Sequence, residues 1–314
     1  MSGGIILLDK PAGMTSMACD SFIKRTVGTK KVGHSGTLDP FATGLLPVFW
    51  GDALKVVRYT DGYDKAYRCT AFFGSETDTE DTEGQVTGGR MPSEDELSDL
   101  KASDFALIRK AFAEVASSAE QMPPLYSAKK IGGRKAYEIA RAGEIPELQP
   151  HRIRIDSLDI TGIEIKDGGV LVTFDVACSK GTYIRSICRD AGRITGFGAH
   201  AVSLRRPRSG PFCVEDARTP DEIRAVTEGC PDISKAEFSI SRERAFDQMP
   251  VLQLQEKQFQ DIKLGRKIGL PSEDMPEGTL YRAMYDGKTA AVVFRSDEEG
   301  KKILRIDRML WKDE

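Results

Sequence analysis

The chain has 314 residues, of which 40% are hydrophobic and 30% charged, and its formal net charge is −3. The apolar content excludes a wholly disordered chain, and the length predicts about two domains. The longest nearly apolar stretch, residues 44–51, is far shorter than the roughly 20 residues of a membrane helix. The apolar run Ile5–Leu8 is too short for the core of a signal peptide, so we expect a soluble, cytoplasmic protein.

Strand and helix patterns alternate irregularly through the first two thirds of the chain. In order, they are a strand at 4–8, a helix between an N-cap at Thr15 and Gly28, a loop at 29–40, a helix at 52–59, a strand at 67–73, helices from Ser93 and over 104–116, strands at 151–165 and 169–178, a helix at 181–195 with Ile184, Ile187, Ala191 and Ile194 inward, and a strand at 199–205. This mixture predicts an α/β domain with a mixed, mainly antiparallel sheet.

Charge is unevenly distributed within this region. Residues 76–104 carry ten acidic and two basic side chains, so the rest of the chain has a net charge of +5. We expect the acidic stretch 75–84 to be a loop or a hairpin tip. Residues 122–143 combine five cations with aromatic residues and a glycine pair, which predicts a basic hairpin followed by a short helix. Each basic cluster, including the one at 205–208, is typical of a solvated surface, but several clusters in separate segments favour a folded basic surface.

The sequence changes character near residue 248. A strand at 251–255, a helix at 256–264 and three alternating strands at 279–285, 289–295 and 303–310 predict a small, mostly β domain. Asp286-Gly287 is typical of a two-residue hairpin turn between the first two of these three strands. The predicted domains are therefore residues 1–247 and 248–314.

Several kinds of site are disfavoured by the motifs that the chain lacks. The six cysteines form no C-x-x-C pair and the three histidines have no metal-ligand spacing, so we expect reduced, packed thiols and no metal site. Neither the P-loop nor the dinucleotide-binding glycine motif occurs. G-H-S-G at 33–36 is one residue short of the serine-hydrolase elbow.

The segment G-H-S-G-T-L-D-P at 33–40 is the most distinctive candidate site. Asp39 precedes a proline, which biases its backbone away from the helical region. Gly33, Gly36 and Gly44 could let a ligand approach the backbone closely. A lone Asp-Pro pair would be interpreted as an ordinary Asx turn.

Seven segments, in order, resemble the bacterial tRNA pseudouridine-55 synthase family, often called TruB. They are L-L-D-K-P-A-G-M-T-S at 7–16, G-H-S-G-T-L-D-P-F-A-T-G-L-L-P at 33–47, D-K-A-Y-R at 64–68, T-D-T-E-D-T-E-G at 77–84, P-P-L-Y-S-A-K-K at 123–130, S-K-G-T-Y-I-R-S at 179–186 and G-A-H-A-V-S-L-R-R at 198–206. The resemblance implies the α/β pseudouridine synthase fold and a C-terminal domain similar to PUA modules. It also implies isomerisation of uridine 55 in the T-arm of tRNA, without cofactor, metal or membrane, by a monomer that needs no protein partner.

The resemblance also implies roles for individual residues. Asp39 matches the catalytic aspartate of the family, Tyr67 the tyrosine that stacks on the target base, and Arg185 the arginine paired with that aspartate. Positions that match substrate-contacting residues are His34, Lys55, Asp81, Tyr183 and Leu204. The region 123–143 matches an RNA-gripping insertion, whose candidate phosphate contacts are Lys129, Lys130, Arg134 and Lys135.

The implied reaction breaks the N1–C1′ bond of uridine and joins C5 to C1′ without a net redox change. A carboxylate could attack C1′, add to C6 or act as a base at C2′, and the sequence leaves these routes open. Two other functions are also open. An RNA-binding or tRNA-folding factor without turnover is disfavoured by the intact Asp39, Tyr67 and Arg185, and a guide-RNA-dependent synthase is disfavoured by the insertion and by the lack of a long lysine-rich extension.

Overall fold

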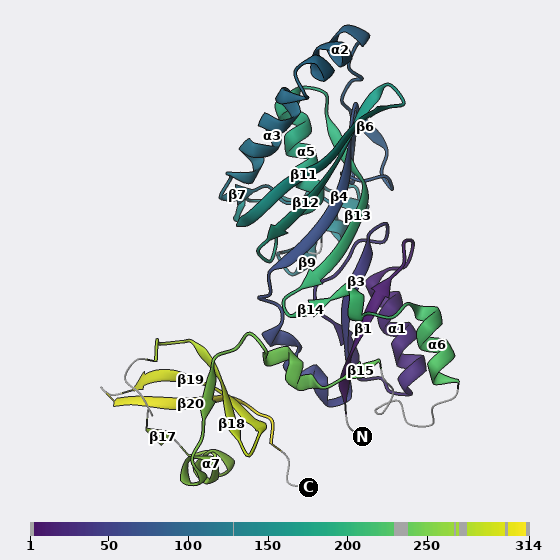
Figure 1. Ribbon diagram of the computed structural model, residues 1–314. Coiled ribbons are helices and arrows are strands. Elements are labelled where there is room, and N and C mark those ends of the chain that lie inside the picture. The colour runs from purple at the N-terminus through teal and green to yellow at the C-terminus, as the bar shows by residue number, and fades with distance from the viewer. Residues whose placement is uncertain are drawn as a thin grey trace. The chain divides into compact units, whose positions relative to one another are not determined.

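The computed structural model describes residues 3–127, 129–228, 238–266, 268–269, 275–298 and 301–311. The chain divides into two compact units after Ser241 (Figure 1). This division lies six residues before the domain boundary at 247/248 that the sequence suggested. The shift arises because η4 (Arg242–Phe246) bonds to the second unit: Arg242 donates to the Leu310 carbonyl at 2.9 Å, and Glu243 pairs with Arg282 at 2.7 Å.

The first unit is built on a nine-stranded sheet that confirms the predicted mixed, mainly antiparallel topology. Its main path runs β11–β12–β4–β13–β3–β1–β15, and β14 and β2 pair with β13 and β3. All of these pairs are antiparallel except β13 with β3. The strands are β1 (Gly4–Lys10), β2 (Val32–His34), β3 (Thr43–Trp50), β4 (Lys65–Phe73), β11 (Ile155–Lys166), β12 (Gly169–Cys178), β13 (Ala199–Ser209), β14 (Phe212–Cys213) and β15 (Ser239–Ile240).

The helices of this unit include all of those that the sequence predicts, and two, η2 and α6, that it did not. They are α1 (Ser16–Val27), the 3₁₀ helix η1 (Gly51–Tyr59), α2 (Glu94–Ala102), α3 (Ala106–Ala116), α5 (Ile184–Thr195), η2 (Val214–Asp216) and α6 (Pro220–Thr227). Figure 1 shows α3 and α5 side by side on one face of the long strands. No helix within the described part of the chain is long and apolar enough to cross a membrane.

Two sequence predictions in this unit need correction, and one strand was not predicted. The expected loop 29–40 contains β2, and the apolar run at 43–50 forms β3 in the interior of the sheet. Ile194 was expected to point inward but is 38% exposed, because it lines a hollow at the surface together with Glu114 and Asp190. Among the cysteines, the four at 19, 69, 178 and 188 are free and buried, as predicted, whereas Cys230 lies outside the described residues.

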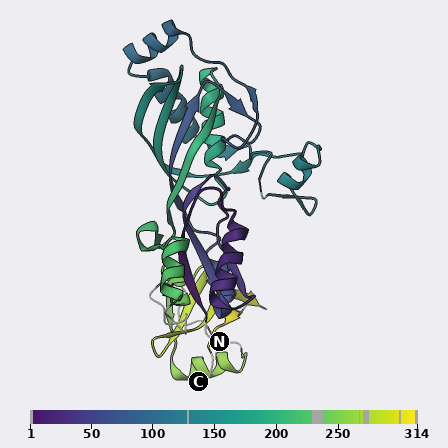
Figure 2. The same ribbon diagram turned by 90° about the vertical axis from the view of Figure 1, so that its right-hand side faces the viewer.

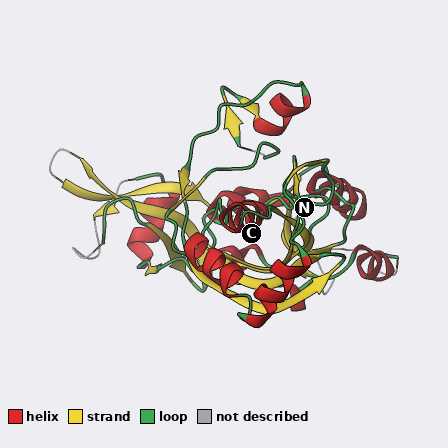
Figure 3. Ribbon diagram, turned by 90° about the horizontal axis from the view of Figure 1, so that it is seen from above, coloured by secondary structure: helices red, strands yellow, loops and turns green. Residues whose placement is uncertain are grey.

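Residues 122–150, called the excursion below, form a chain segment that contains the predicted insertion at 123–143. The chain enters and leaves this segment through a short two-stranded ladder. The ladder pairs β7 (Glu120–Gln121) with β10 (His151–Arg152). Within the excursion, β8 (Lys130–Ile131), β9 (Arg134–Lys135) and α4 (Ala136–Arg141) form the hairpin and helix that the sequence predicts. Figures 2 and 3 show this hairpin and helix standing off from the main sheet.

The second unit is a small, mostly β structure, as predicted. Its five-stranded sheet has the order β16–β18–β19–β20–β17. Its elements are β16 (Val251–Gln253), α7 (Glu256–Lys263), β17 (Ile268–Gly269), β18 (Leu280–Tyr285), β19 (Lys288–Glu298) and β20 (Lys301–Met309). Asp286 and Gly287 have φ angles of 46° and 70°, which is the geometry of the two-residue turn that the sequence suggested.

Candidate active site

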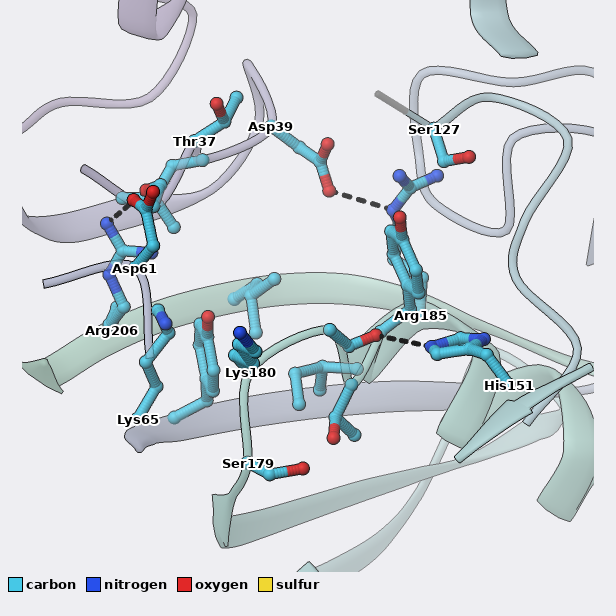
Figure 4. Close-up of a pocket in the computed structure, with 18 of the residues that line it drawn as sticks. Thr37, Asp39, Asp61, Lys65, Ser127, His151, Ser179, Lys180, Arg185 and Arg206 are labelled. Carbon is cyan, nitrogen blue, oxygen red and sulfur yellow. Dashed lines mark hydrogen bonds and ion pairs between the residues drawn. The ribbon is translucent and has the colours of Figure 1, made fainter. Parts of the chain in front are cut away.

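A cavity of about 600 Å³ opens in the first unit, where several of the sequence motifs meet. Its walls come from the loop before β3, the loop 179–183, the start of α5, and strands β4 and β13 (Figure 4). Five of the predicted site residues line it: Asp39, Tyr67, Tyr183, Arg185 and Leu204. The fold therefore gathers residues from five of the seven motif segments around one space.

Arg185 and Asp39 form the central ion pair of the cavity. The buried Arg185 donates through Nε to Asp39 Oδ2 at 2.8 Å, and through Nη2 to the Tyr126 carbonyl at 3.0 Å. Its Nη1 donates to the Thr79 carbonyl and lies 3.5 Å from Asp81 Oδ2. A cation in the first turn of a helix is disfavoured by the helix dipole, so these acceptors must hold the guanidinium there.

The two carboxylates beside Arg185 have different surroundings. The side chain of Asp39 is 35% exposed, whereas that of Asp81 is 4% exposed. Asp81 does not line the cavity, and its Oδ1 accepts from the Thr79 hydroxyl at 2.6 Å. Asp39 is therefore the carboxylate that a molecule in the cavity can reach, and Asp81 holds Arg185 from behind.

The backbone on both sides of Asp39 is held by residues that precede it in the chain. The ammonium of the fully buried Lys10 donates to the carbonyls of Met14 and Pro40, at 2.7 and 3.0 Å. Ser16 Oγ exchanges hydrogen bonds with the backbone of Leu38, at 2.9 and 3.0 Å. Burial lowers the pKa of Lys10. Sequence analysis did not single out Lys10 or Ser16, although both belong to the segment at 7–16.

Tyr67 lies on β4 beside a second, fully buried arginine. Arg206 on β13 donates to the carbonyls of Leu45 and Gly36 at 2.8 and 2.7 Å, and its Cζ lies 6.0 Å from the centroid of the Tyr67 ring. Burial raises the pKa of the Tyr67 hydroxyl, and the Arg206 charge opposes that rise. Arg206 is 0% exposed, so the cluster at 205–208 is not simply a solvated surface.

The glycines of the 33–44 segment make room for the protein itself. A Cβ on Gly44, where φ is 101°, would lie 2.5 Å from the Arg206 carbonyl oxygen, because β3 and β13 pair closely at this point. A Cβ on Gly36 would lie 3.1 Å from Lys65 Cε. Packing within the protein therefore requires glycine at both positions. These contacts do not by themselves indicate the close approach of a ligand that the sequence suggested.

A further cation, Lys65, lines the cavity and was missed by sequence analysis. It is buried, and its ammonium donates to the Tyr63 carbonyl at 2.9 Å. Burial, together with the nearby Arg206, lowers the pKa of Lys65. Figure 4 shows Lys65 and Arg206 on one side of the cavity and the Asp39–Arg185 pair on the other. Lys65 stands two residues before Tyr67 in the segment at 64–68, and this position could have identified it as a candidate site residue.

The acidic stretch lies in the hairpin of β5 (Glu76–Thr77) and β6 (Val86–Gly88), as predicted, and part of it is buried. The buried Glu80 accepts from the Ser186 hydroxyl at 2.8 Å and from Arg189. Burial raises the pKa of Glu80, and Arg189 opposes the rise. Arg185, Ser186 and Arg189 share one face of α5, so two acids of the stretch, Glu80 and Asp81, serve as partners for that helix.

Besides Asp81, the predicted substrate residues His34 and Lys55 also lie outside the cavity lining. His34 Nδ1 lies 2.9 Å from Asp20 Oδ2, and its Nε2 lies 3.1 Å from the hydroxyl of Thr37, which does line the cavity. Lys55 is on η1, with its ammonium 3.8 Å from Asp52. His34 is therefore connected to the cavity through one hydroxyl, whereas nothing described connects Lys55 to it.

The four predicted phosphate-binding cations lie on the excursion, and Lys129, Arg134 and Lys135 are outside the cavity lining. Lys129 donates to the Gln149 carbonyl at 3.1 Å, and Arg134 pairs with Glu144 at 3.2 Å. The Lys135 ammonium lies 5.3 Å from the centroid of the Tyr137 ring. The side chain of Lys130 is outside the described part of the structure.

Several polar residues at the cavity escaped sequence analysis. The polar lining also includes Asp61, Ser127, His151, Arg152, Ser179, Lys180 and Thr182. His151 Nε2 lies 2.9 Å from the Gly181 carbonyl, as the dashed line in Figure 4 marks. Within the described residues, no three His, Cys, Asp or Glu side chains converge as metal ligands would.

Comparisons with known proteins agree with the motif pattern. The sequence model described as the TruB family pseudouridylate synthase (N-terminal domain) matches residues 24–184. The chain is 42% identical to the tRNA pseudouridine synthase B of Syntrophotalea carbinolica over 71% of this chain and 69% of that protein. It is 32% identical to the tRNA pseudouridine synthase B of Geobacter sulfurreducens over 96% of this chain and 99% of that protein. Among solved structures, a Cbf5–Nop10–Gar1 complex contains a chain of similar fold, with a TM-score of 0.69, 25% identity and coverage of 98% of this chain and 84% of that chain.

Proposed function

The chain belongs to the TruB family of pseudouridylate synthases, and we propose that it isomerises uridine 55 in the T-loop of tRNA to pseudouridine. The name of the relatives, tRNA pseudouridine synthase B, supports a tRNA substrate. The observation that carries the proposal is Asp39, a partly exposed carboxylate that faces a cavity of about 600 Å³ and is held by a buried arginine. That volume is in the range of about 300–1,000 Å³ that is usual for small-molecule sites.

Asp39 is the residue that reacts with the substrate in this proposal. Arg185 binds Oδ2, which leaves Oδ1 for attack at C1′, for addition to C6 or for proton removal at C2′. Each route needs an ionised carboxylate, and the Arg185 guanidinium lies 2.8 Å from Asp39 Oδ2. The N1–C1′ bond breaks, the uracil turns, C5 bonds to C1′, the proton on C5 leaves, and N1 takes up a proton.

Residues around Asp39 hold the flipped nucleotide. The ring of Tyr67 stacks on the uracil, and Tyr183 and Leu204 contact the nucleotide from the opposite walls of the cavity. His34 contacts RNA beside the cavity, and Lys55 contacts it farther out. Asp81 was expected to touch the substrate, but its burial favours a positioning role through Arg185.

The excursion and the second unit bind the rest of the tRNA. Extruding a stacked base costs a few kcal/mol, which contacts elsewhere must offset. Cations of the excursion, namely Lys129, Lys130, Arg134 and Lys135, contact phosphates of the T-arm, since phosphate contacts supply most of the affinity of such complexes. The second unit acts as a PUA-like RNA-binding domain, and the enzyme works as a monomer without a guide RNA.

One experiment tests the proposal against its alternatives. Purified protein is incubated with a single unmodified tRNA transcript, without guide RNA or other proteins, and the product is mapped for pseudouridine. Conversion at position 55 that is absent from the Asp39→Asn variant supports the proposal. Binding without conversion would favour an RNA-binding or tRNA-folding factor, and conversion only after a guide RNA is added would favour a guide-dependent synthase.

A further inference from the structure

The base of the excursion is bonded directly to the wall of the cavity. Gln121 and His151 face each other in the β7–β10 ladder, where the chain leaves for the excursion and returns. The amide of Gln121 donates through Nε2 to the Tyr183 carbonyl at 3.1 Å and accepts through Oε1 from the Tyr183 N–H at 2.9 Å. His151 donates through Nε2 to the Gly181 carbonyl at 2.9 Å, and its ring meets that of Tyr183 edge-on, with centroids 6.0 Å apart.

These bonds determine where α5 begins. Tyr183 is the N-cap residue of α5, and its own side chain makes no capping hydrogen bond. Gln121, which is 4% exposed, instead binds both polar groups of the Tyr183 backbone. Only an amide can donate and accept in this way, so a side chain of equal length without these groups would release the start of the helix. Arg185 stands two residues later.

A second set of bonds joins the excursion to the same helix. The carbonyl of Tyr126 accepts from Arg185 Nη2 at 3.0 Å, and the carbonyl of Met122 accepts from Arg189 Nη2 at 2.9 Å. Both carbonyls lie within the first five residues of the excursion. A displacement of its base would therefore move acceptors of Arg185 as well as the turn on which Arg185 stands.

We propose that Gln121 is a positioning residue for the isomerisation. It fixes the first turn of α5, and through it the distance between Arg185 and Asp39, and it connects RNA binding by the excursion to that geometry. The inference rests on the proposed function for its kinetic consequence. The position of the helix start can be measured without any activity.

The main test compares Gln121→Met with the wild type in single-turnover reactions with excess enzyme and in separate equilibrium binding to tRNA. Methionine keeps the length of the side chain and loses both hydrogen bonds. The rate at saturating enzyme should fall about ten- to hundredfold, because a displacement of about 1 Å at a reacting group can cost that much. The Kd should stay within about twofold. Gln85→Met, the same change at an exposed position, is the matched control and should alter neither quantity.

Two further variants make the test specific. His151→Phe keeps an aromatic ring against Tyr183 and loses only the bond to Gly181, so its saturated rate should fall roughly fivefold, as about 1 kcal/mol predicts. This variant decides the question if Gln121→Met does not fold. Because Gln121 acts through Arg185, the double variant Gln121→Met/Arg185→Lys should be little slower than Arg185→Lys alone.

Hydrogen exchange separates this inference from the proposed function. The amides at 183–187 should exchange faster in Gln121→Met than in the wild type, whether or not the protein makes pseudouridine. Unchanged exchange there, a saturated rate within about twofold of the wild type, or a loss confined to Kd would each overturn the positioning role. Absence of pseudouridine from the wild-type reaction, with faster exchange in the variant, would instead contradict the proposed function.

Discussion

Replacing Arg185 by lysine tests the Asp39–Arg185 pair most directly, because it keeps the charge and removes the planar fork. The guanidinium uses Nε for Asp39, Nη1 for Thr79 and Asp81, and Nη2 for Tyr126. A lysine ammonium is a single point with three donors, and it cannot reach acceptors arranged around three separate nitrogens. We expect it to keep about one of the three hydrogen bonds, which go to Asp39, Thr79 and Tyr126.

The size of the effect follows from the hydrogen bonds that a lysine cannot make. Hydrogen bonds to a charged group contribute about 1.5–3 kcal/mol each, so removing two of them costs about 3–6 kcal/mol. We assume that half of this loss lowers the stability of the fold and that the other half, about 1.5–3 kcal/mol, raises the activation barrier. The rate then falls by roughly ten- to two-hundredfold, since about 1.4 kcal/mol is a factor of ten. The variant should therefore fold with a lowered melting temperature and react slowly.

The measurement is a single-turnover time course with excess enzyme on tRNA labelled with tritium at uracil C5, because formation of the C5–C1′ bond releases that hydrogen to water. Arg154→Lys is the matched control. Arg154 also pairs with two carboxylates, Asp64 and Asp156, but its side chain is exposed, so the change should cost under about 0.5 kcal/mol. A rate for Arg185→Lys within about threefold of the wild type would refute the catalytic pairing.

Three further predictions concern the carboxylate, the RNA contacts and a surface helix. Asp39→Asn should abolish turnover and leave the Kd for tRNA within about twofold, because phosphate contacts dominate binding; substantial activity in a pure variant would exclude the assigned role. Replacing all four excursion cations by alanine should weaken binding and reduce the slope of log K against log salt by up to about 0.9 for each phosphate that is no longer neutralised; an unchanged slope would place the RNA elsewhere. Hydrogen bonds from Arg90 and from the Ser93 N–H lower the pKa of Glu96 to about 2, below its ordinary 4.5. Its stabilisation is therefore complete above about pH 4.5 and lost as the pH falls toward 2, so Glu96→Gln should lower the melting temperature at pH 7, with a difference that shrinks on acidification.

Local features of the chain were predictable wherever their signal lies within a few neighbouring residues. Val170, Val172 and Phe174 alternate along β12 and are all buried, as a period of two requires. Thr15 and Ser93 were predictable as the N-caps of α1 and α2. A capping side chain accepts a hydrogen bond from a backbone N–H only two or three residues later, so the signal is local. The turn at 286–287 is equally local.

Strands of the sheet interior were harder to predict. β3 is buried on both faces between β1 and β13, so it has no alternation of polar and apolar residues that would identify it as a strand. β2 has only three residues, and it is a strand because β3 lies beside it. Both elements depend on neighbours that lie elsewhere in the chain.

The identities of Asp39, Tyr67 and Arg185 as candidate site residues were available from the order of the motifs, because those segments resemble a known family. Their geometry was not, since Asp39 and Arg185 are 146 residues apart and meet at 2.8 Å only in the folded chain. The buried positions of the charged residues Lys10 and Arg206 were likewise not predictable from the sequence. Lys10 bonds to a carbonyl 30 residues away and Arg206 to one 161 residues away, and a charged side chain without a local partner is ordinarily placed at the surface. Tertiary structure decided these positions because a buried charge is stable only where distant backbone and side-chain groups converge to satisfy it.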